Sequence, residues 1–97
     1  MTGPLTLDSI VIASPDQVSS DLAGETVLLS MTSAKYYGFA GVGSRIWELI
    51  ATATPVRSIC DTIGAEFEVE RAECEADVLG FLEQCVKSGL VEVRSGA

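Results

Sequence analysis

The chain has 97 residues, of which 47% are apolar and 21% are charged, and its formal net charge is −8. These values indicate a single globular domain and exclude a disordered chain, and no apolar run approaches the ~20 residues that a membrane-spanning helix needs. Histidine is absent and the six basic residues are scattered, which argues against a zinc site and against a nucleic-acid surface.

The first half of the chain has the pattern of short strands separated by turns. An apolar run at 10–13 is closed by a Ser-Pro-Asp turn. Residues then alternate between apolar and polar over 18–22 and 27–31, which predicts two half-buried strands with turns at 23–24 and 32–34. A third strand at 35–40 completes a predicted antiparallel meander.

After residue 40 the apolar period changes to that of a helix. A first helix is predicted from 42 to about 53, followed by a second with Thr54 as its cap, Pro55 at its first position and Gly64 at its end. The third helix is predicted over about 70–88, with Gly89 as a left-handed C-terminal cap. The apolar stripe of this helix consists of Cys74, Val78, Phe81, Leu82 and Cys85.

The order of three strands followed by three helices predicts an α+β fold. A short link at 65–69 joins the second and third helices, an arrangement that resembles a winged helix-turn-helix. Val91 and Val93 predict a short final strand or an extended tail. We expect one domain over 1–97, with an ordered core of about 8–94.

The glycine-rich segment GFAGVG at 38–43 invites comparison with phosphate-binding loops. Its spacing is the reverse of the dinucleotide fingerprint, and no Lys-Ser/Thr pair follows as in a P-loop. No strand with a terminal acid follows at the distance that a dinucleotide site requires. Gly41 and Gly43 are therefore predicted to allow a tight entry into the first helix and close packing.

Catalytic and metal sites have little support. Without histidine, a general base would have to be a carboxylate, a lysine, a tyrosine or a thiolate. The acids gather over 61–77, where the dipole of the third helix alone accounts for several of them. The three cysteines have no CxxC spacing and are interpreted as core residues, so we expect no catalytic residue, metal or cofactor.

The two tyrosines of YYGF are predicted to lie on opposite faces of their strand. Because neighbouring strand residues point to opposite faces, Tyr37 and Phe39 face the core and Tyr36 faces outward. This strand is the edge of the meander, and Lys35 is the only protection that its sequence offers. An edge of this kind can accept an extended peptide by strand addition.

Two segments together resemble the PqqD-like proteins, particularly the stand-alone versions of lasso-peptide biosynthesis. They are DLAGETVLLSMTSAKYYGFAGVGSRIWELI and ADVLGFLEQCVKSGLV, and the resemblance extends over roughly 18–93. It implies a recognition element for ribosomally synthesised and post-translationally modified peptides (RiPPs), without chemistry of its own. Such a domain pairs the leader segment of a precursor peptide, as an extra antiparallel strand, with the third strand of its sheet and against the third helix.

The resemblance also implies a site and partners. Carried over by position, the peptide-binding residues are Ala34, Lys35, Tyr36, Tyr37, Gly38 and Phe39 on the strand, and Cys74, Asp77, Val78, Phe81 and Leu82 on the helix. The implied partners are the leader, a cysteine-protease-like leader peptidase and an ATP-dependent macrolactam synthetase. Neither nucleic acid nor membrane is expected as a partner, and the missing signal peptide indicates a cytoplasmic protein.

Two residues depart from the family pattern. Ala34 stands where glycine is frequent, and it would cost about 1 kcal/mol if the turn needs a positive φ. Ala40 stands where asparagine is common, so Gly41 is expected to take over as the cap of the first helix. The alternative functions are a chaperone for the precursor of PQQ or of another RiPP, and a DNA-binding winged helix.

Overall fold

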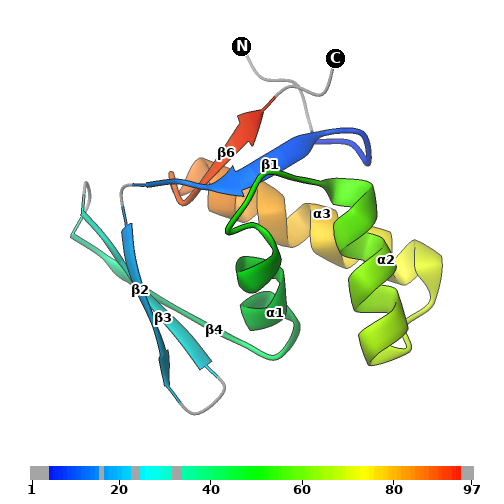
Figure 1. Cartoon of the computed structure of the whole chain (residues 1–97), viewed down its shortest axis with the longest axis horizontal. Helices are drawn as coiled ribbons and strands as arrows, with labels where there is room; N and C mark the ends of the chain where they lie inside the picture. The colour runs from blue at the N-terminus through cyan, green and yellow to red at the C-terminus, as the bar shows by residue number, and fades with distance from the viewer. Residues whose placement is uncertain (1–4, 16, 23–24, 32–33, 95–97) are drawn as a thin grey trace.

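The computed structural model describes residues 5–15, 17–22, 25–31 and 34–94, and Figure 1 shows its arrangement. The turns predicted at 23–24 and at 32–33 lie outside the described residues. In chain order, the elements are β1 (Ile10–Ala13), β2 (Gln17–Leu22), β3 (Glu25–Ser30), β4 (Tyr36–Ala40), α1 (Val42–Leu49), β5 (Thr54–Pro55), α2 (Val56–Phe67), α3 (Arg71–Lys87) and β6 (Val91–Arg94).

The strands form two separate antiparallel sheets. The predicted meander is present in the order β2-β3-β4, and a second sheet has the order β5-β1-β6. Figure 1 shows the meander at the lower left of the molecule and the second sheet across the top of the helices. The α+β class and its winged-helix-like order are thus confirmed. The sequence analysis did not predict the pairing of β1 with β6, nor the short strand β5.

The core lies where α2 and α3 pack together beneath β1 and α1. The predicted stripe of α2 is buried, with Ile59 and Ile63 at most 2% exposed. On α3, Cys74, Val78, Leu82 and Cys85 are buried as predicted. The periodicity of apolar residues therefore identified the packing faces of both helices correctly.

Several helix ends differ from the prediction. The first helix ends at Leu49 rather than near residue 53, because Thr54 and Pro55 pair with β1 as β5. Thr54 is not the cap of α2; its hydroxyl donates to the carbonyls of Leu49 and Thr52, and Pro55 occupies the cap position. Gly64 does not end α2, which continues to Phe67 and is followed by Glu68 in the left-handed conformation.

The C-terminal cap predicted for α3 at Gly89 is present in the structure. Gly89 has a φ of 78°, and its N–H donates to the carbonyl of Val86, while the N–H of Leu90 donates to that of Cys85. These two bonds form a Schellman motif, which satisfies carbonyls that the helix would otherwise leave unpaired. The motif turns the chain from α3 into β6.

The buried face of the meander is opposite to the one that the apolar alternation indicated. On β3, Leu28 is fully buried together with Thr26 and Ser30, whereas Val27 and Leu29 are only half-buried. Met31 and, on β2, Val18 are 64% and 57% exposed. The physical reason is that hydrogen bonds satisfy Thr26 inside the fold, which removes the cost of burying it.

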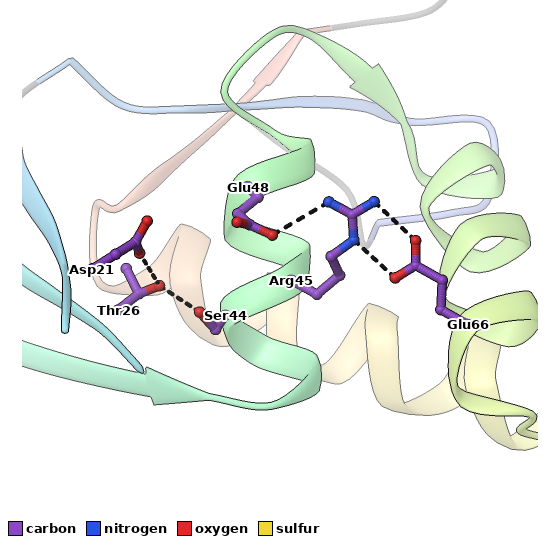
Figure 2. A network of polar contacts seen from close by, with 6 residues as sticks. All are labelled: Asp21, Thr26, Ser44, Arg45, Glu48 and Glu66. Carbon is purple, nitrogen blue, oxygen red and sulfur yellow. Dashed lines mark hydrogen bonds and ion pairs between the residues drawn. The ribbon is translucent and has the colours of Figure 1, made fainter. Parts of the chain in front are cut away.

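Figure 2 shows the polar contacts that place α1 between the meander and α2. The hydroxyl of Thr26 donates to the carboxylate of Asp21 at 3.1 Å, so the hydroxyl of Ser44 is the donor in the 2.5 Å contact with Thr26. On the other side of α1, Arg45 forms a bidentate pair with Glu66 of α2, at 2.8 and 2.9 Å. The Arg45 hydrogen bonds lower the pKa of the Glu66 carboxyl.

The turn before β4 contains a strained alanine. Ala34 has a φ of 56°, so the positive φ considered for this turn is present. We expect Ala34→Gly to raise the free energy of unfolding by about 0.5–1 kcal/mol, because glycine adopts this conformation without the steric cost of a Cβ atom. Urea unfolding measures the change. The control is Ala40→Gly, which should lower stability, and a lower stability of Ala34→Gly would contradict the strain.

Candidate functional site

A hollow of about 140 Å³ lies between β4 and the C-terminal half of α3. Tyr37 and Phe39 of β4 form one wall and Phe81 forms part of the other, so the hollow is mainly apolar. The full lining consists of Tyr37, Phe39, Phe81, Gln84, Cys85, Ser88 and Leu90. The strand and the helix that were predicted to form a site are thus brought together, but farther along α3 than expected.

Aromatic packing holds the inner end of the hollow. The rings of Phe39 and Phe81 meet edge to face, with 4.9 Å between their centroids, and the ring of Trp47 lies 5.8 Å from that of Phe39. A Cβ atom on Gly43 would lie 3.1 Å from Cε1 of Phe81. Glycine at this position therefore permits the close approach of α1 to Phe81, as the sequence analysis predicted for the glycine segment.

The entry from β4 into α1 depends on a second glycine. Gly41 is the N-cap residue of α1, with a φ of 59° and a ψ of −123°, and no side chain caps this helix. Residues with a Cβ atom rarely adopt this conformation. The expectation that Gly41 takes over the cap position is confirmed, and no phosphate site is needed to explain the glycines.

The register of the meander shows which backbone groups of β4 are free to pair. The N–H of Ser30 donates to the carbonyl of Lys35, which makes these two residues a hydrogen-bonded pair of the antiparallel ladder. Because such pairs alternate, Tyr37 and Phe39 also bond to β3. The N–H and C=O groups of Tyr36, Gly38 and Ala40 therefore point to the outer edge, where no described strand lies.

The two faces of β4 are used differently. Tyr37 and Phe39 are half-buried against the core, whereas Tyr36 is 74% exposed, so the predicted orientation of the two tyrosines is confirmed. Gly38 is on the same face as Tyr36, and a Cβ atom there would meet nothing within 4 Å. The inner face of this strand is therefore an apolar wall, and its outer face is open at Gly38.

The five residues of α3 that the resemblance assigned to the peptide site lie in three different places. Phe81 lines the hollow, and Asp77 is exposed one helical turn before it. Cys74, Val78 and Leu82 are at most 1% exposed and lie in the core, and Cys74 points its thiol at the carbonyl of Cys60. Four further lining residues were not predicted: Gln84, Cys85, Ser88 and Leu90. The first three are three, four and seven residues after Phe81, and this helical spacing was the available signal, whereas Leu90 lies beyond the end of α3.

Two of the three thiols, those of Cys60 and Cys85, are held in their protonated form. Burial raises the pKa of Cys85 to about 12 and that of Cys60 to about 11. Among the described residues no group of histidine, cysteine and acidic side chains could hold a metal ion. Within those same residues no helix is long and apolar enough to cross a membrane.

These pKa values predict slow alkylation of the folded protein. Iodoacetamide reacts with the thiolate, and at pH 8 the raised pKa values leave little thiolate at Cys60 and Cys85. Below their folded pKa values the thiols of Cys60 and Cys85 stay neutral, so we expect no modification of these two residues at pH 8 and complete modification in urea. Mass spectrometry counts the adducts, and rapid labelling of Cys60 or Cys85 in the native protein would contradict the burial.

The geometry is shared with known proteins. A sequence model of the family described as coenzyme PQQ synthesis protein D (PqqD) matches residues 25–91, and no curated protein matches the chain. The chain is 36% identical to TbiB1, whose structure was solved in complex with the TbiA(beta) leader peptide; the match covers 84% of this chain and 94% of that one, with a TM-score of 0.79.

A second solved structure, lasso peptide synthetase B1 complexed with the leader peptide, has the same fold. It matches with a TM-score of 0.76 over 84% of this chain and 96% of that one, at 18% identity. The family match covers most of the chain and includes β3, β4 and all three helices. The chain therefore belongs to the PqqD family.

Proposed function

We propose that the protein is a non-catalytic adaptor that captures the leader segment of a ribosomally synthesised precursor peptide. The observation that carries this proposal is the edge of β4, which no described strand covers, beside an apolar hollow between this strand and α3. An extended peptide on this edge gains main-chain hydrogen bonds from the sheet, while side chains on one of its faces enter the hollow.

The register specifies the contacts of such a peptide. Its backbone would exchange hydrogen bonds with Tyr36, Gly38 and Ala40, the residues whose polar groups point outward. Every second side chain would face the hollow between β4 and α3. Main-chain pairing supplies affinity without regard to sequence, so the apolar hollow supplies the selection of leader residues.

Within RiPP maturation, the lasso-peptide branch has the most support. The structure that is 36% identical to this chain is described as a complex with a leader peptide, and the second similar structure is described as a lasso peptide synthetase component. We propose a cytoplasmic role in which the adaptor delivers the bound precursor to a cysteine-protease-like leader peptidase and to a macrolactam synthetase. PQQ synthesis is the alternative that the family description favours.

The surface charge argues against the alternative of DNA binding. Arg71 on α3 already forms ion pairs with Asp61 and Glu75, at 2.5 and 2.6 Å. Lys87 is then the one basic side chain of α3 without an ion pair, beside several acids on the same helix. Phosphate neutralisation needs a cluster of cations, which α3 does not present.

Fluorescence anisotropy tests the proposal. The labelled probes are the leader of the precursor peptide encoded beside this protein, a scrambled version of that leader, a PQQ precursor peptide and a DNA duplex. We expect saturable binding of the leader alone. Binding of the duplex but not of the leader would overturn the adaptor function, and preferential binding of the PQQ precursor would move the protein to that pathway.

A further inference from the structure

The groove is the hollow between β4 and α3 together with the adjoining surfaces of the strand and the helix. A basic side chain, Lys35, is near one end of this groove, and an acidic side chain, Asp77, is near the other. Lys35 precedes Tyr37 by two residues, and its carbonyl is part of the ladder with β3. Lys35 is exposed and directly precedes β4. Since Tyr37 lines the hollow and lies near the start of this strand, we infer that the ammonium group of Lys35 lies beyond the Tyr37 end of the hollow.

The opposite end carries an acid. Asp77 is exposed and precedes Phe81 by four residues, so the two side chains share one face of α3. Phe81 contacts Phe39, and Gln84 and Ser88 follow it on the groove side of the helix. Figure 1 shows α3 and β4 running in opposite directions. Because Phe81 meets Phe39 and Asp77 precedes Phe81 on α3, we infer that Asp77 lies beyond the Phe39 end of the hollow.

Both charges are available to a partner. All four arginines of the chain form ion pairs, and among the described residues Lys35 and Lys87 are the cations without one. Lys87 is one position from Ser88, which is about 100° around the helix, and it does not line the hollow. Asp77 likewise has no ion-pair partner among the described residues.

We propose that the groove binds an extended peptide in one direction and selects its charge pattern: a basic residue N-terminal to the apolar centre and an acidic residue C-terminal to it. A peptide that continues the antiparallel order of the meander runs opposite to β4. Its N-terminal part then lies near Asp77 and its C-terminal part near Lys35. This inference rests on the proposed function and specifies the substrate of that same site.

Two versions of the encoded leader test the charge pattern. Both keep the apolar centre; one has a lysine before it and an aspartate after it, and the other has the two charges exchanged, so composition and net charge are equal. In anisotropy at low salt we expect the first version to bind about fivefold more tightly, since each exposed pair contributes little. The double variant Lys35→Glu with Asp77→Lys is expected to reverse the preference.

The outcomes separate this inference from the proposed function. If neither version binds, the adaptor function itself fails. If both bind equally to the native protein and to the double variant, the groove has no charge polarity and the inference is overturned. A reversed preference of the native protein would show a parallel peptide, which also overturns it. The double variant keeps the net charge of the native protein. Lys87→Glu is the control for a charge reversal on α3 away from the hollow, and it should leave the preference unchanged.

Discussion

Replacing Gly38 by proline is expected to lower the affinity for the leader at least about tenfold, because the substitution removes an outward N–H and fills the edge with a ring. The N–H of Gly38 points away from β3, so the proline leaves the ladder between β3 and β4 intact. Edge strands tolerate proline at such positions. Anisotropy with the encoded leader measures the loss.

Gly38→Ala is the matched control for this variant. A Cβ atom at this position meets nothing within 4 Å, and it points to the face opposite the hollow. We therefore expect Gly38→Ala to keep the affinity within about twofold, since it retains the backbone donor. Circular dichroism and urea unfolding check that both variants fold. A folded Gly38→Pro protein with native affinity would place the peptide elsewhere than on β4.

The choice of Gly38 for this substitution depends on knowing which backbone N–H groups of β4 point outward, and the sequence alone does not give this. The sequence identifies the strand and indicates that Tyr37 faces the core, and a proline at Tyr37 is the obvious test from that information. The register places the N–H of Tyr37 in the ladder with β3, so proline there would damage the sheet itself. Which amides of an edge strand point outward depends on pairing, and the pattern of side chains along one strand leaves it open.

The buried faces of the helices and of β4 were predictable, whereas the buried face of β3 was not. The stripe that includes Val78 and Leu82 repeats over several turns, so the whole helix determines its buried face. On β3 the decision rested on a few residues, and Thr26 is buried because Asp21 and Ser44 satisfy its hydroxyl. Such partners are distant in sequence, and apolar alternation cannot reveal them.

The residues of the candidate site were also predicted only in part. The resemblance assigned Phe39 on the strand and Phe81 on the helix to the site, and their rings do meet. It also assigned Val78 and Leu82 to the site, but these side chains contribute to the core. The part of α3 that lines the hollow includes Gln84 and Ser88, and which face of a helix lies toward a strand depends on tertiary packing that one sequence pattern leaves open.

Replacing Gln84 by tryptophan should block the hollow and lower the affinity for the leader about tenfold or more. The side chain of Gln84 is exposed and lines the hollow, so a large ring there competes with the side chain of the peptide for the same space. The substitution leaves the core residues of α3 untouched, so the free energy of unfolding should change by less than about 0.5 kcal/mol.

Lys87→Trp provides the matched comparison, because it adds the same ring to an exposed position of α3 that does not line the hollow. We expect Lys87→Trp to bind the leader like the native protein, and the difference between the two variants isolates occupation of the hollow from the addition of an aromatic surface. Equal affinities of two folded variants would show that the leader does not use the hollow, even if it pairs with β4. In that case, main-chain pairing would have to supply the affinity, and selection among leaders would need another surface.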